Sequence, residues 1–85
     1  MRTVEIYTTP FCPYCHAAKR LLQKKGITYS EIDVSHDPLL RAQMTQRANG
    51  RRTVPQMFIG AQHVGGSDDL HALDHAGKLD PMLAD

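Results

Sequence analysis

The spacing of hydrophobic and polar residues predicts strands and helices that follow one another in the order β-α-β-α-β-β-α. Runs rich in β-branched and aromatic residues predict strands at residues 4–8, 28–34, 56–59 and 62–64. Gly60-Ala61 separates the last two runs and predicts a tight turn, so these two strands should form a hairpin.

Apolar residues at helical spacing predict three helices that each bury one face. The apolar faces are Cys15, Ala18, Leu21 and Leu22; Leu40, Met44 and Ala48; and Leu70, Leu73 and Ala76. The start signals are Pro13 for a helix that continues through Lys25, Asp37-Pro38 for the second helix, and Ser67-Asp68-Asp69 as caps for the third. The stop signals are Gly26, Asn49-Gly50 and Gly77, and Asp80-Pro81 starts a last turn.

This order of elements predicts an α/β fold with a mixed four-stranded sheet that helices cover on both faces. A helix joins the first two strands, so these strands should be parallel and connected by a right-handed crossover. The chain has 85 residues, which is enough for one modest hydrophobic core. We therefore expect a single domain over residues 1–85.

Composition and charge narrow the class of protein. Hydrophobic residues make up 41% of the chain, which is typical of a globular protein and not of a disordered one. The formal net charge is +1 at pH 7, so no strong field attracts nucleic acid or a membrane surface. No apolar run is long enough to span a bilayer, and no signal-peptide core follows Met1. We therefore expect a cytoplasmic protein.

Both cysteines of the chain stand in Cys12-Pro13-Tyr14-Cys15, where the first predicted strand gives way to the first helix. In the cytosol such a pair is more often catalytic or metal-binding than a structural disulfide. At a helix start, unpaired N–H groups and the helix dipole favour a thiolate, the reactive form, at Cys12. Cys15 lies one turn further, on the apolar face, so we expect it to be more buried and Cys12 to attack.

Other uses of the cysteine pair remain open from the residues alone. It can be a passive part of the core. With His16 it spells Cys-x-x-Cys-His, the attachment pattern of c-type haem, although that chemistry usually accompanies export and we expect His16 on the exposed helix surface. With His71 and His75 it supplies four potential zinc ligands. The strand–helix setting favours the redox interpretation, and we expect no bound metal.

The chain resembles the glutaredoxins over essentially its whole length. Three motifs carry the resemblance, namely Cys12-Pro13-Tyr14-Cys15, Thr53-Val54-Pro55 and Gly65-Gly66-Ser67-Asp68-Asp69. The resemblance implies a thioredoxin-like fold and glutathione-dependent reduction of protein disulfides and protein–glutathione mixed disulfides. It also implies that Cys12 is the nucleophile and that Cys15 resolves the intermediate.

The resemblance further implies a site for glutathione as a co-substrate, with no bound cofactor. The Val54–Pro55 bond would be cis, and the Val54 backbone would pair with the cysteinyl part of glutathione. Ser67 and Asp68 would bind the γ-glutamyl end. The implied glutathione-binding residues are Tyr14, Thr53, Val54, Pro55, Gly66, Ser67 and Asp68. We expect a monomer whose partners are glutathione and proteins that carry disulfides or bound glutathione.

One position departs from the family pattern. Many glutaredoxins have a lysine three residues before the first cysteine, and this chain has Thr9 there. Candidates for a replacement are the nearby basic residues Arg47, Arg51 and Arg52. The missing lysine leaves room for a redoxin of the same fold that a flavoprotein reductase reduces, whereas Ser67-Asp68 argues against it. A second rival is a carrier of a [2Fe–2S] cluster between two protomers, which Pro13 disfavours because it stiffens the turn.

Overall fold

The predicted elements all appear in the computed structural model, which describes residues 2–84. They are β1 (Val4–Thr8), α1 (Pro13–Lys24), β2 (Ser30–Asp33), α2 (Pro38–Arg47), β3 (Gln56–Ile59), β4 (Gln62–Gly65), α3 (Ser67–His75) and α4 (Leu79–Leu83). The predicted last turn is the short helix α4. β2 begins later than predicted because its ladder with β1 starts only where Ser30 lies opposite Glu5.

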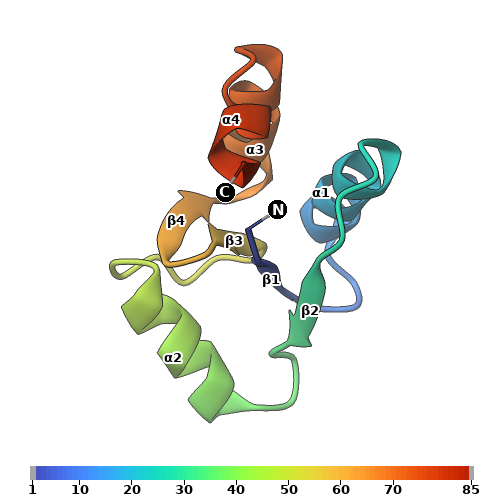
Figure 1. The fold of residues 1–85 in the computed structure, drawn as a ribbon. Helices are drawn as coiled ribbons and strands as arrows, with labels where there is room; N and C mark the ends of the chain where they lie inside the picture. Colours follow the sequence, from blue (N-terminus) through green and yellow to red (C-terminus); the bar gives the residue numbers. More distant parts are fainter. Residues whose placement is uncertain (1, 85) are drawn as a thin grey trace.

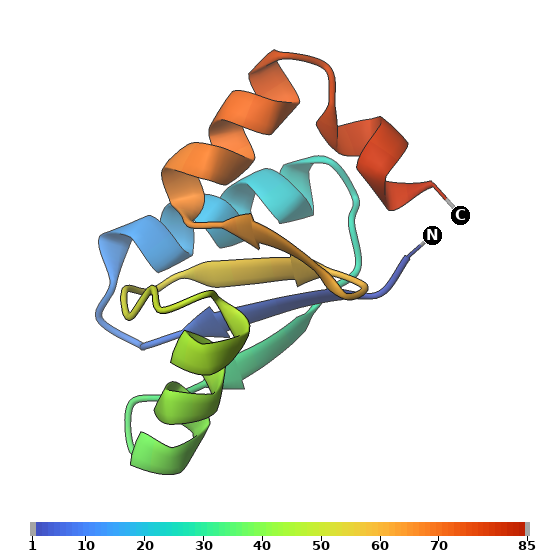
Figure 2. The same ribbon diagram turned by 90° about the vertical axis from the view of Figure 1, so that its left-hand side faces the viewer.

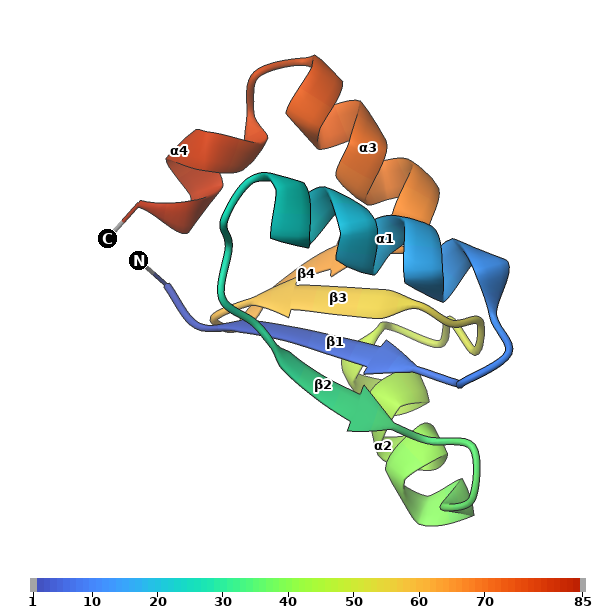
Figure 3. The ribbon, with the colours of Figure 1, turned by 90° about the vertical axis from the view of Figure 1, so that its right-hand side faces the viewer.

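The four strands form one mixed sheet in the order β2-β1-β3-β4. As predicted, β1 and β2 are parallel and β3 and β4 form an antiparallel hairpin, while β1 also pairs with β3 in the antiparallel sense. Figure 1 shows α1 and α2 on different sides of the sheet. The side views place α1 and α3 together over one face and α2 under the other (Figures 2 and 3). The predicted coverage of both sheet faces is therefore confirmed.

The alternation of side chains along the strands divides the hydrophobic core into two clusters, one on each face of the sheet. Ile6 faces α1 and α3, whereas the next residue, Tyr7, faces α2. Met57 and Phe58 divide in the same way on β3. Burial of each such large apolar side chain contributes about 1.5–3 kcal/mol to folding, so both layers hold β1 and β3 firmly in place. The candidate site is built at the ends of these two strands.

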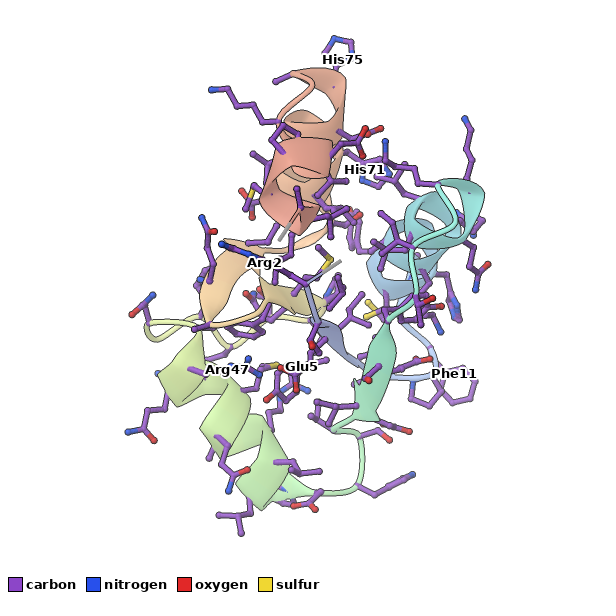
Figure 4. All side chains as sticks on the ribbon, in the orientation of Figure 1. Arg2, Glu5, Phe11, Arg47, His71 and His75 are labelled. Atoms are coloured by element: carbon purple, nitrogen blue, oxygen red, sulfur yellow. The ribbon has the colours of Figure 1, made fainter. Side chains whose placement is uncertain are left out.

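Arg47, one of the three candidates for the missing lysine, packs against Phe58 of the second cluster and does not line the candidate site. Its Nη2 atom is 2.7 Å from Glu5 Oε1, and its guanidinium lies 4.0 Å from the centre of the Phe58 ring. Figure 4 shows Arg47 and Glu5 side by side between α2 and β1. Arg47 is the last residue of α2, and its side chain reaches across to Glu5 on β1. Arg47 therefore fixes α2 to the sheet.

None of the helices in residues 2–84 combines the length and the apolar character needed to cross a membrane.

Candidate active site

Cys12 occupies the N-cap position of α1, at the end of the loop that follows β1. Its backbone is extended, with φ of −112° and ψ of 108°, and Pro13 fills the first helical position, where no N–H is needed. The Cys12 sulfur takes the place of a capping oxygen, because the Cys15 N–H donates to it at 3.1 Å. The half-buried Cys12 side chain remains accessible.

Cys15 is fully buried on the inner face of α1, as predicted. Burial, assisted by the neighbouring Cys12 sulfur, raises the pKa of the Cys15 thiol to about 12. Cys15 therefore stays protonated at neutral pH in the reduced protein, in which both cysteines are free thiols. Two cysteines in one helical turn thus have different accessibility, and only Cys12 can meet a bulky substrate directly.

The segment between α2 and β3 brings Val54 to the Cys12 sulfur. The Val54 carbonyl oxygen lies 3.6 Å from Cys12 Sγ, although 42 positions separate the two residues along the chain. The Val54–Pro55 peptide bond is cis, as the family resemblance implied. Pro55 is buried while Val54 is partly exposed, so the backbone of Val54 borders the space next to the sulfur.

The start of α3 completes the site, but its cap differs from the predicted one. The N-cap residue is Gly66, and Ser67 is already the first helical residue. The cap bond comes from within the helix, because the Asp69 carboxylate accepts the Gly66 N–H at 2.9 Å. Gly65 has a φ of 118°, and a Cβ there would overlap that carboxylate. A glycine is therefore required before the cap, and the carboxylate takes the role that we expected of a capping residue.

These segments enclose an open pocket with a volume of about 150 Å³. The residues that line it are Tyr14, Arg51, Thr53, Val54, Pro55, Gly66, Ser67, Asp68 and Asp69. The structure thus brings together all the glutathione-binding residues that the resemblance implied, from three distant parts of the chain. It adds Asp69, which we had considered only as a cap, and it selects Arg51 from the three arginine candidates.

The charges at the pocket are divided between a paired group and an accessible one. Arg51 Nη1 lies 2.9 Å from Asp69 Oδ2. This guanidinium, together with the Gly66 N–H, holds the pKa of the Asp69 carboxyl below its usual value. Asp68 is exposed and forms neither an ion pair nor a side-chain hydrogen bond within residues 2–84. Its carboxylate is therefore available to a cationic group in the pocket. The exposed Arg52 does not line this pocket, and its carbonyl accepts a hydrogen bond from Arg41.

A buried polar residue behind the pocket was missed by the sequence analysis. Gln56 has no exposed surface, and its side chain donates to Thr53 Oγ1 at 3.2 Å. The other end of the amide, Oε1, lies 2.7 Å from His63 Nε2 on the neighbouring strand β4. A glutamine that opens an otherwise apolar strand was the available signal, because a buried amide must find hydrogen-bond partners.

The histidines named in the sequence analysis do not join the cysteine pair. His16 is exposed, as expected, and its Nε2 lies 2.9 Å from the Pro10 carbonyl oxygen in the loop before Cys12. The ring of His71 is held by the Ser67 carbonyl oxygen, 2.7 Å from Nδ1. In the described part of the chain, no three His, Cys, Asp or Glu side chains are grouped to hold a metal ion. The zinc set of Cys12, Cys15, His71 and His75 is therefore not assembled.

Comparisons with known proteins agree with this fold. The chain matches the family model described as Glutaredoxin over residues 4–64. It is 56% identical over 84 residues to a glutaredoxin of Pseudomonas aeruginosa, covering 99% of each chain. The solution structure of glutaredoxin from Brucella melitensis is similar, with a TM-score of 0.86 and 58% identity over 98% of this chain and 89% of that one. A crystal structure of a buckwheat glutaredoxin–glutathione complex gives a TM-score of 0.87 at 33% identity, over 96% of this chain and 76% of that one. The expected thioredoxin-like fold is confirmed, and the chain belongs to the glutaredoxin family of thiol–disulfide oxidoreductases.

Proposed function

We propose that this protein uses glutathione to reduce protein disulfides and protein–glutathione mixed disulfides. The observation that supports this most strongly is the placement of Cys12. Its sulfur accepts an N–H from α1 and lies 3.6 Å from Val54 O, at the edge of the pocket. The similar buckwheat glutaredoxin is described in complex with glutathione. A pocket beside an accessible sulfur suits a ligand that brings its own sulfur to the same place.

In the first step, the Cys12 thiolate attacks one sulfur of the substrate disulfide. A bond forms between Cys12 Sγ and that sulfur, the substrate S–S bond breaks, and the other sulfur leaves as a thiolate that takes a proton from solvent. When the substrate is a glutathionylated protein, Cys12 attacks the glutathione sulfur. Glutathione then remains on Cys12, and the protein leaves as a free thiol.

Two routes complete the reaction. In the monothiol route, the thiolate of a second glutathione attacks the glutathione sulfur on Cys12, so that oxidised glutathione leaves and the Cys12 thiolate is restored. In the dithiol route, Cys15 gives up its proton and attacks Cys12 Sγ, which releases the substrate as a thiol and leaves a Cys12–Cys15 disulfide. Two glutathione molecules then return two electrons and leave as oxidised glutathione.

The pocket offers complementary groups to both charges of the γ-glutamyl end. The N–H groups in the first turn of α3, beginning with Ser67, have no partner within the helix and suit the carboxylate. The exposed Asp68 side chain suits the ammonium group on the same carbon. The Val54 backbone suits pairing with the cysteinyl part, because peptide-like ligands bind exposed backbone in the manner of an added strand. Tyr14 closes the pocket on the α1 side.

Arg51 takes the role of the missing lysine and binds the glycine carboxylate in this scheme. It lines the pocket, whereas Thr9 carries no charge and Arg47 points to Glu5. Asp69 holds one side of the guanidinium at 2.9 Å. A guanidinium has five N–H donors, so the others remain for a ligand carboxylate. All these groups belong to one chain, and we therefore expect the protein to work as a monomer. We place it in the cytoplasm, as expected from the sequence.

A coupled assay with glutathione, glutathione reductase and a small glutathione mixed disulfide tests the proposal. We expect turnover that requires glutathione and that Cys12→Ser abolishes, because a hydroxyl does not attack a disulfide at neutral pH. Reduction of the wild-type protein by a flavoprotein thioredoxin reductase, with no response to glutathione, would instead establish the redoxin alternative. Visible absorption by anaerobically purified protein, together with absence of turnover, would establish the iron–sulfur carrier.

A further inference from the structure

We propose that the groove between α1 and α3 binds an acidic segment of the polypeptide that carries the substrate disulfide. This inference rests on the proposed reduction of protein substrates and adds a source of substrate selection outside the pocket for glutathione. The groove is lined by Ala17, Arg20, Leu21, Lys24 and His71. Ala17 and Leu21 give it an apolar floor, and Figure 4 shows His71 on the side of α3 that faces α1.

The basic residues of the groove differ from the other cations of the same helix. Lys19 lies 3.0 Å from Glu31, and Lys25 lies 2.6 Å from Asp74 and 3.2 Å from Asp80. Arg20 and Lys24, by contrast, have no acidic partner within residues 2–84. Both line the groove, so carboxylates of a ligand can meet positive charge there without displacing an internal ion pair.

The groove continues from the candidate active site along both helices. On α1, Tyr14 lines the active-site pocket and Ala17 lines the groove one turn later. On α3, Ser67 and His71 are related in the same way. The Lys25–Asp74 pair joins the far ends of the two helices. A polypeptide that is attached to Cys12 through a disulfide therefore passes close to the groove where it leaves the active site.

The spacing along α1 determines where the acidic residues should lie in the substrate. With a rise of about 1.5 Å per residue, Arg20 lies about 12 Å and Lys24 about 18 Å along the helix from Cys12. An extended chain advances about 3.3 Å per residue, so acidic residues about four to six positions from the substrate cysteine would reach both cations. A substrate peptide binds along the groove in one direction only. We therefore expect acidic residues to favour reaction on one side of the substrate cysteine, either before it or after it.

The test uses short single-cysteine peptides joined through a disulfide to an aromatic thiol of low pKa, which leaves more readily than the peptide thiolate, so that Cys12 becomes attached to the peptide. One peptide has glutamates four to six residues before the cysteine, one has them after it, and a third has glutamines on both sides. We expect one glutamate peptide to have a kcat/KM about three- to tenfold above that of the glutamine peptide in low salt, and much less in 0.2 M salt, where charges are screened. The double variant Arg20→Gln/Lys24→Gln should lose this difference.

The matched control is the double variant Arg2→Gln/Lys78→Gln, which removes the same charge from exposed positions outside the groove. It should keep the preference for the glutamate peptide, and thermal unfolding of all variants checks that they remain folded. Equal kcat/KM for the glutamate and glutamine peptides in the wild-type protein would overturn the proposal. So would a preference that survives in Arg20→Gln/Lys24→Gln. Turnover of a small glutathione mixed disulfide without a peptide tests the proposed function alone, because it does not depend on the groove. Failure of the groove proposal can therefore be distinguished from failure of the proposed function.

Discussion

His63 Nε2 on β4 lies 2.7 Å from Oε1 of Gln56, the buried first residue of β3. The Gln56 amide also donates to Thr53 Oγ1, so these hydrogen bonds reach a residue that lines the candidate active site. Figure 3 shows β3 and β4 side by side beneath α3. The hydrogen bonds therefore connect a ring on the sheet to a residue at the pocket, and they fix the orientation of the Thr53 side chain.

Gln56→Leu should remove this support without changing the volume of the side chain greatly. Thr53, which is exposed, and His63, which is half-buried, would each lose a partner, and each lost hydrogen bond costs about 0.5–1.5 kcal/mol of the free energy of unfolding. We expect a several-fold rise in KM for glutathionylated substrates with a smaller change in kcat, because Thr53 lines the pocket but does not react. Gln62→Leu, at an exposed position on β4, is the control. An unchanged KM in folded Gln56→Leu would show that the backbone alone orients Thr53.

His63 should make the folded protein sensitive to mild acid. Burial holds the pKa of the His63 imidazole below its usual value of 6.5, with a further lowering by Arg51 that Asp69 partly opposes. The folded state therefore binds the proton less well than the unfolded state. Its contribution to stability is complete above pH 6.5 and is lost as the pH falls through the lower pKa of the folded state.

Urea unfolding at pH 7.5, 6.0 and 5.0 checks this expectation about His63. The wild-type protein should lose more stability over this range than His63→Gln, which does not titrate. Identical pH dependence in the two proteins would contradict it. His63 also stacks on Phe58 at 5.0 Å, so the comparison uses the change with pH and not the stability at one pH.

The order of the elements and the difference in burial between the two cysteines could be predicted from sequence because both depend on local periodicity. Cys15 shares the spacing of Ala18 and Leu22, and all three are buried. The parallel pairing of β1 and β2 also followed from a local feature, the helix between them. These conclusions needed no knowledge of which distant segments meet.

Other features could not be predicted because they depend on tertiary contacts. Arg47 and Arg51 are four residues apart, yet one pairs with Glu5 beneath the sheet and the other with Asp69 at the pocket. The bond between Gln56 and His63 requires the β3–β4 register, which is interrupted between Met57 and Phe58. The Ser-Asp-Asp run suggested a side-chain cap, but the conformation of Gly65 places Gly66 at the cap and turns Asp69 back onto it.

The adjacent aspartates at the start of α3 should respond differently to mutation. Asp68→Asn should raise the KM for glutathionylated substrates about three- to tenfold and leave stability nearly unchanged, because Asp68 is exposed and suits the γ-glutamyl ammonium. Asp69→Asn should lower the free energy of unfolding by about 0.5–2 kcal/mol, because it weakens the cap bond to Gly66. Steady-state kinetics and urea unfolding of both variants separate these effects. Full activity of folded Asp68→Asn at low substrate concentration would remove Asp68 from the proposed site.

Cys15→Ser should separate the two routes of the proposed reaction. A glutathione molecule on Cys12 can be removed by a second glutathione, so reduction of a small glutathione mixed disulfide should retain a substantial part of its rate. A protein held on Cys12 is normally released by Cys15, which lies one helical turn away and therefore acts at high effective concentration. Reduction of a protein disulfide by the variant should accordingly fall by at least about tenfold.

The measurement of Cys15→Ser compares both substrates in the same coupled assay, with Cys12→Ser as the inactive reference. The buried position of Cys15 makes a stability check necessary, and Cys15→Ala serves as a second variant because it places no hydroxyl in the core. Equal loss of both activities in a folded variant would exclude the monothiol route. Activity retained by Cys12→Ser but not by Cys15→Ser would reverse the assignment of the nucleophile. Because the Cys12 sulfur is accessible while the Cys15 thiol is buried with a pKa of about 12, we expect neither result.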